Sequence, residues 1–130
     1  MIFTNQIDES YSKIYPAAED LAEFSAVTLT KNGVKLCAAD EIPFGIVLND
    51  ALAGDEVTVQ IRGAGYWLAG AALNAGDFLT SDASGQAIKA AKDQFIFAQA
   101  LKNAAAGEAC EVLIIRCGYA TGEETADDDI

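Results

Sequence analysis

Apolar and polar residues alternate with a period of two along much of this chain, as in β-strands that have one buried and one solvated face. The clearest stretch alternates three apolar with three polar residues: Val57, Thr58, Val59, Gln60, Ile61 and Arg62. A short β-branched run at 26–30 precedes Asn32-Gly33, a strong signal for a hairpin turn. The pattern predicts antiparallel strands joined by tight turns, with Gln60 and Arg62 in water. Helix should be scarce, and residues 16–24 are its best candidate.

Residues 109–116 follow the same alternation with one difference. The inner positions are again apolar, at Cys110, Val112 and Ile114. Leu113 and Ile115, however, stand where the first stretch has Gln60 and Arg62. The outer face of this strand is therefore apolar, and we expect either a loop of the same chain or a neighbouring subunit to cover it.

Two segments of the chain, residues 21–61 and 73–114, look like diverged copies of one β unit. Gly33 aligns with Gly85 and, after one inserted residue, Gly54 aligns with Gly107. The predicted fold class is all-β: a compact β-barrel or sandwich built from two duplicated units. We expect a single domain over 1–130, with an N-terminal arm (1–20), a first unit (21–62), a connector (63–72), a second unit (73–117) and an acidic tail (118–130).

The N-terminal arm carries apolar and aromatic side chains with no apparent counterpart ahead of the second unit. They are Ile2, Phe3, Ile7, Tyr11, Ile14 and Tyr15. Apolar side chains outside a core need another surface, so we expect an extended arm that packs on a partner. In the connector, Tyr66 and Trp67 form an aromatic cluster that belongs either to the core or to a contact surface.

Charge excludes several kinds of partner. Twenty acidic residues against eight basic ones give a net charge of −12, which disfavours nucleic acid and anionic membranes. No apolar run reaches the roughly 20 residues that a membrane helix needs. The first ten residues lack the basic-then-apolar pattern of a signal peptide, so we expect the protein to stay in the compartment where it is made.

The residues needed for catalysis are scarce. The chain has no histidine, which excludes histidine-based triads and histidine-ligated metal sites. The three cysteines are odd in number and form no Cys-x-x-Cys pair; we expect Cys110 to be buried and Cys117 to be half-exposed. Pairs of acids such as Asp55-Glu56 fall in predicted turns. We therefore expect no enzyme activity, no catalytic or metal-ligating residues and no cofactor.

Residues 77–91 combine an Asp-Phe-Leu-Thr strand, an Asp-Ala-Ser-Gly turn and an apolar return strand. A second strand at 97–101 and an Ala-Ala-Gly-Glu turn at 105–108 follow, and the first unit echoes this order. The arrangement resembles the head-decoration or capsid-cement proteins of tailed bacteriophages, over about residues 21–119. One departure is Ala98, near which the group has a glycine.

This resemblance implies a small, non-enzymatic virion protein. Decoration proteins of this kind commonly sit as homotrimers on the outer capsid surface, where they bind neighbouring subunits of the major capsid protein and stabilise the shell. Such a protein would be made in the host cytoplasm. The residues that would contact the capsid or another subunit are those of the arm together with Tyr66, Trp67, Leu113 and Ile115.

One alternative stays open. Duplicated β units rich in Ala-Gly-Asp also occur in biotinyl and lipoyl carriers, which carry their cofactor on a lysine at a hairpin tip. Lys31, beside Asn32-Gly33, is the only candidate in such a place. A small-ligand-binding β-domain is a related possibility, and an enzyme of unknown type that uses the Tyr66-Trp67 region is a further one.

Overall fold

The computed structural model describes residues 10–121, and this range contains no helix. Its nine strands are β1 (Tyr11–Pro16), β2 (Ala26–Thr30), β3 (Gly33–Leu36), β4 (Gly45–Val47), β5 (Glu56–Leu68), β6 (Phe78–Ser81), β7 (Ala87–Lys89), β8 (Phe95–Ala100) and β9 (Ala109–Tyr119). The all-β prediction is confirmed. The helix expected at 16–24 is absent, because Ala17 and Leu21 form isolated β-bridges with other parts of the chain.

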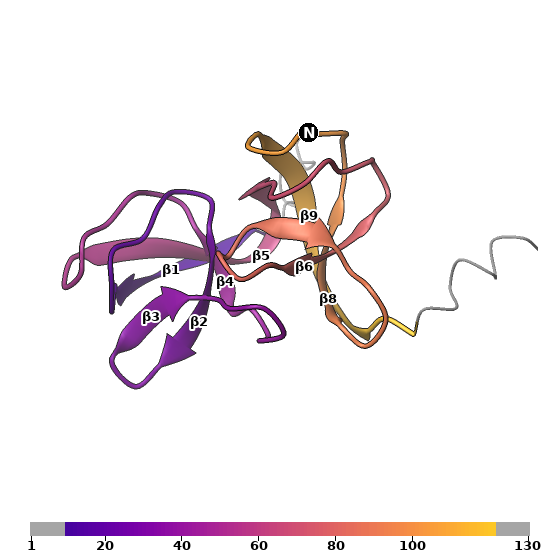
Figure 1. Ribbon diagram of the computed structural model, residues 1–130. Helices are drawn as coiled ribbons and strands as arrows, with labels where there is room; N and C mark the ends of the chain where they lie inside the picture. Colours follow the sequence, from indigo (N-terminus) through magenta and orange to yellow (C-terminus); the bar gives the residue numbers. More distant parts are fainter. Residues whose placement is uncertain (1–9, 122–130) are drawn as a thin grey trace, which may run out of the picture.

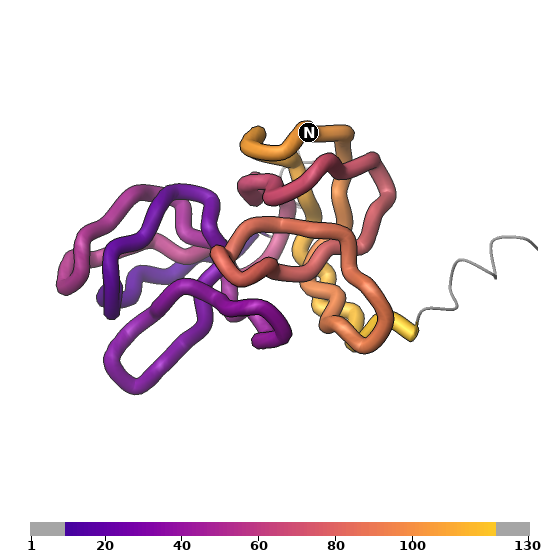
Figure 2. The backbone as a smooth tube through the Cα atoms, in the orientation of Figure 1, coloured from indigo at the N-terminus to yellow at the C-terminus, as the bar shows by residue number. Residues whose placement is uncertain are grey.

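The paired strands are antiparallel and form one curled sheet in the order β3-β2-β4-β5-β9-β8-β6-β7, with β1 beside β5. Bridges from Ala17 to Val34 and from Ala69 to Ala87 draw the edges of the sheet inward. The result is two curled half-barrels. Figure 1 shows the first half (residues 10–62, indigo to magenta) beside the second half (residues 63–121, pink to yellow), and Figure 2 shows the same arrangement of the backbone.

The two halves repeat one pattern of backbone hydrogen bonds. In the first half Leu21 and Ala51 bond to each other at 2.8 and 3.0 Å, and in the second half Leu73 and Ala104 do so at the same distances. In the first half, β1 pairs with the first part of β5. In the second half, the second part of β5 pairs with β9 in the same register, so that Tyr15↔Val57 corresponds to Trp67↔Cys110. The expectation that the arm has no counterpart ahead of the second unit is therefore wrong for Tyr11–Pro16.

β5 is shared by the two halves. Its first part pairs with β1 and β4, and its second part, from Gly63 onward, pairs with β9. Gly63 has a φ of +96°, and a Cβ there would lie 2.6 Å from the Cα of Ser10. The expected connector is wrong for residues 63–68, because the backbone of Gly63 redirects the strand to a new partner without ending it.

The core consists of two clusters. One lies within the first half and includes Val27, Val47 and Val59. The other is centred on the second half but also includes Ala26 and Ile46, which belong to β2 and β4 of the first half. The second half therefore covers one face of the first, and this contact joins the halves.

Gln60 lies at this contact and is buried, against the prediction that it faces water. It pairs with Ile46 across the sheet, and its side chain lies against Gly65. Its amide nitrogen donates hydrogen bonds to the carbonyl oxygens of Arg62 (3.1 Å) and Ala64 (2.8 Å). Because those bonds satisfy both N–H groups of the amide, Gln60 can be buried without an unpaired donor.

β9 also bends in mid-strand. Arg116 has a φ of +48°, after which the strand continues beside β8 as far as Tyr119. The prediction that residues 118 and 119 belong to the acidic tail is wrong, because both pair with β8. The acidic residues from 123 onward lie outside the described range.

Candidate functional site

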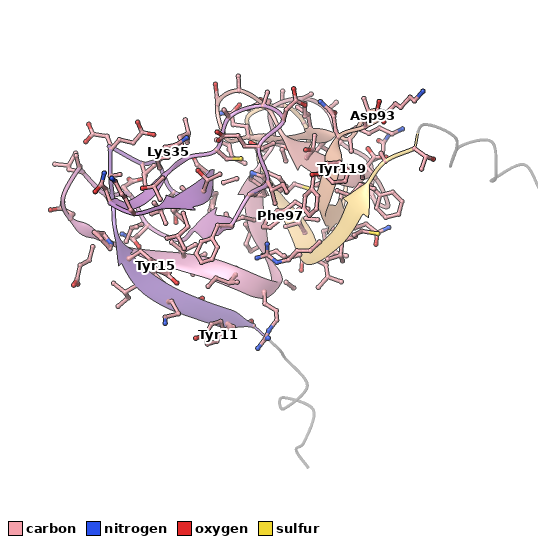
Figure 3. The ribbon with its side chains drawn as sticks, turned by 90° about the horizontal axis from the view of Figure 1, so that it is seen from below. Tyr11, Tyr15, Lys35, Asp93, Phe97 and Tyr119 are labelled. Carbon is pink, nitrogen blue, oxygen red and sulfur yellow. The ribbon has the colours of Figure 1, made fainter. Side chains whose placement is uncertain are left out.

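The predicted contact residues of the arm fall into three groups. Ile2, Phe3 and Ile7 lie outside the described residues. Tyr11 and Ile14 are exposed on β1, and Arg62 lies over the Tyr11 ring at 5.4 Å from its centre. Figure 3 shows Tyr11 at the outer end of β1. Tyr11 and Ile14 are therefore available to a partner.

Tyr15 belongs to the core of its own chain. Its ring meets Phe44 edge-on, with 5.4 Å between the ring centres, and it packs against the first cluster. The expectation that Tyr15 packs on another protein is corrected, because β1 pairs with β5 and turns this side chain inward. Its alternation with the exposed Ile14 is the period of two that a strand imposes.

The structure separates Tyr66 from its neighbour Trp67. Trp67 is fully buried, meets Phe97 edge-on at 5.5 Å, and donates a hydrogen bond from Nε1 to the carbonyl oxygen of Gly85 at 2.9 Å. A partner cannot reach it, so its assignment to a contact surface is corrected. Tyr66 points the opposite way and is exposed, with Phe24 at 5.8 Å between ring centres.

Leu113 and Tyr66 lie on one outer surface of the second half. Leu113 pairs with Ala64 on one side and with Gln99 on the other, and Gln99 in turn pairs with Phe78. Leu101 continues the same surface, since its backbone N–H bonds to Glu111, which is the partner of Tyr66. We name this surface the outer face; it comprises Ala64, Tyr66, Phe78, Gln99, Leu101, Glu111 and Leu113.

Sequence reasoning missed two large apolar members of the outer face. Phe78 and Leu101 are both exposed, although each begins or follows a strand whose other residues are mostly buried. Alternation within β6 places Phe78 opposite Leu79 and could have identified it. Of the two predicted outer residues of β9, Leu113 is exposed and Ile115 is half-buried, so Leu113 is the more accessible.

A separate hollow lies on the first half. It is a shallow, open depression of about 530 Å³, lined by Asp20, Leu21, Ala22, Asp50, Ala51, Leu52 and Asp55. All three of its carboxylates accept backbone hydrogen bonds: Asp50 from Glu23 at 2.8 Å, Asp20 from Ala53 at 2.9 Å and Asp55 from Leu52 at 3.4 Å. These aspartates therefore hold the surrounding loops. Within residues 10–121 no three His, Cys, Asp or Glu side chains are placed to hold a metal ion.

The three thiols differ in their surroundings. Cys37 and Cys110 are buried, as expected for Cys110, and Cys117 is exposed. Burial raises the pKa of the Cys37 thiol to about 11, which keeps the thiol protonated and unreactive at neutral pH. Burial also raises the pKa of Cys110. Neither buried thiol is placed for nucleophilic chemistry.

Lys31, the lysine of the carrier alternative, is exposed in the turn between β2 and β3. A hairpin tip is the position that this alternative requires. The turn next to it is held by the Thr30 hydroxyl, which donates to the carbonyl oxygen of Gly33 at 2.7 Å. Nothing else in the surroundings of Lys31 points to a carrier.

Comparison with known proteins agrees with this arrangement. No curated protein matches the sequence. Among solved structures, the base of the head fibre gp8.5 of bacteriophage phi29 shares the fold, with a TM-score of 0.68 at 20% identity over 85% of this chain and 98% of that one. A family model described as phage cement protein matches residues 6–116, which include all nine strands up to the bend in β9. A buried β scaffold and an exposed apolar face thus coincide with a family match over most of the sequence, and the chain belongs to the phage cement protein family.

Proposed function

We propose that this protein decorates the outer surface of an icosahedral phage capsid, where it binds subunits of the major capsid protein and stabilises the shell. The family match over residues 6–116 is the observation that carries the proposal. The exposed apolar side chains support it, since they offer contact area to a partner. The protein would act by binding alone.

We assign the capsid contact to the arm. Ile14 is 61% exposed and Tyr11 is 44% exposed, and both lie on β1. One edge of β1 pairs with β5, and the chain pairs with β3 only just after β1, through the bridge from Ala17 to Val34. Burial of one such side chain contributes about 1.5–3 kcal/mol, so a few of them cannot offset the loss of translational and rotational freedom unaided. Multivalent attachment to a repetitive shell would make such a weak contact sufficient.

Multivalency requires an oligomer, and the proposed state is a homotrimer. Tyr66 and Leu113 support this proposal because they are exposed and apolar and lie on the second half, whereas β1 pairs with the first part of β5. We also propose that the two halves arose by duplication, and the equivalent hydrogen bonds of Leu21 and Leu73 support that origin. An experimental structure in which the halves fail to superpose would contradict it.

The proposed function is tested by sedimenting the protein with expanded capsids of its own phage. The matched pair is Ile14→Glu and Ile42→Glu, because Ile42 is also exposed, at 49%, but lies in the loop before β4. We expect the wild type and Ile42→Glu to co-sediment with shells and Ile14→Glu to bind at least tenfold more weakly. A wild-type protein that never co-sediments would overturn the function. Equal binding of the two variants would overturn the assignment to the arm.

A further inference from the structure

Within residues 10–121, no segment covers the outer face of the second half, which is mostly apolar. Four of its side chains are large and partly exposed: Leu113 at 37%, Phe78 at 38%, Leu101 at 41% and Tyr66 at 47%. Direct strand pairing connects Phe78, Gln99, Leu113 and Ala64 in one row across β6, β8, β9 and β5. Cross-strand neighbours on one face lie about 4.5–5.5 Å apart, so these residues form one continuous patch.

The equivalent face of the first half is covered. There the corresponding row runs through Ala26, Ile46 and Gln60, with the same pairings between β2, β4 and β5. All three residues are at least 95% buried, and Ala26 and Ile46 are part of the cluster that the second half supplies. The same sheet face is thus packed in one half and open, among the described residues, in the other.

The charged side chains on and around the outer face indicate which kind of partner binds there. Among residues 64–68, 78–81, 95–100 and 109–115 the only charged side chain is Glu111, and Lys102 pairs with it at 3.7 Å. The chain as a whole carries a net charge of −12. Two copies of so acidic a protein repel each other, and a contact between them is favourable only where neither presents unpaired charge.

We propose that the outer face is the surface through which copies of this chain associate with one another. This inference rests on the oligomer of the proposed function and names its interface. The four large side chains present about 300 Å² of exposed surface, roughly 40% of about 200 Å² each. A standard interface buries about 800 Å² per partner, so the self-association is weak and depends on concentration.

The test is sedimentation velocity of the full chain over a range of concentration, at 0.05 and 0.5 M NaCl. We expect association that strengthens severalfold at the higher salt, because salt screens the repulsion between acidic copies. Leu113→Glu and, independently, Leu101→Glu should shift the association to at least tenfold higher concentration. Leu29→Glu is the matched control, because Leu29 is 48% exposed but lies on β2 of the first half. Circular dichroism checks that each variant is folded.

Two results would overturn the inference: a wild type that remains monomeric at both salt concentrations, and equal association of Leu113→Glu and Leu29→Glu. If the wild type is a monomer and Leu113→Glu loses shell binding, the face is assigned to the capsid protein. Self-association that depends on Leu113, without any shell binding, would instead support this inference and overturn the proposed function.

Discussion

Replacing Arg116 should reveal how firmly the last strand holds the two halves together. Its guanidinium donates hydrogen bonds to three carbonyl oxygens of the first half: Pro43 at 3.3 Å, Phe44 at 2.7 Å and Ile61 at 2.8 Å. It also lies 4.9 Å from the centre of the Phe97 ring, which Figure 3 shows between the two parts of the sheet. Arg116 therefore joins β9 to the loop before β4 and to β5.

The magnitude follows from these contacts. A hydrogen bond from a charged donor contributes about 1.5–3 kcal/mol, but this side chain is partly in water, so we count about 1 kcal/mol for each of the two short bonds. The cation–π contact adds about 0.5–1 kcal/mol. Burial lowers the pKa of Arg116, which shows that part of the gain offsets desolvation. We expect Arg116→Met to lower the free energy of unfolding by about 2–3 kcal/mol.

The backbone at this position provides an internal control. Because the φ of Arg116 is +48°, an alanine is strained there by about 1–2 kcal/mol and a glycine is not. Arg116→Gly should therefore be about 1 kcal/mol more stable than Arg116→Ala. The corresponding bend of β5 already has a glycine, Gly63.

Urea unfolding at pH 7, followed by the fluorescence of the buried Trp67, measures all three variants. Arg116→Lys should fall between wild type and Arg116→Met, since a single ammonium cannot reach three carbonyl groups. If Arg116→Met changed stability by less than 0.5 kcal/mol, in the manner of an ordinary surface substitution, the inferred junction between the halves would be wrong.

Three further predictions concern other parts of the fold. Gly45→Ala should lower the free energy of unfolding by about 1–3 kcal/mol, because the new Cβ would lie 2.5 Å from both Gln60 O and Val59 Cγ1. Urea unfolding measures this change, with Ala98→Gly on β8 as the comparison variant. Raising the pH from 9 to 11 should lower the free energy of unfolding through Cys37 by about 2 kcal/mol, since the unfolded thiol ionises first; Cys37→Ala should lose this part of the pH dependence in titrated urea melts. A thiol reagent at pH 8 should modify one cysteine rapidly in the native protein, Cys117, and all three in urea, and rapid modification of Cys37 would contradict its burial.

The sequence by itself determined the strand content and most of the turns. Alternation at Val57, Val59 and at Cys110, Val112 marks the buried faces of β5 and β9, because side chains in a strand point alternately to opposite sides. The glycine turns and the family resemblance depend on short motifs that follow one another in a fixed order along the sequence. The family match over residues 6–116 depends on the same order of motifs. Exposure of Leu113 could be read from its neighbours in the same way.

Only the tertiary structure decided which strands pair and which faces meet. Nothing local distinguishes Gln60 from a solvated strand residue, yet it is buried because the second half packs over β4 and because the backbone of Arg62 and Ala64 satisfies its amide. Residues 63–68 read as a connector, since glycines commonly end strands, but the bend at Gly63 moves β5 to a new partner. Contacts between residues distant in sequence determine both outcomes, and a period of two reports only which way a side chain points, not what lies beyond it.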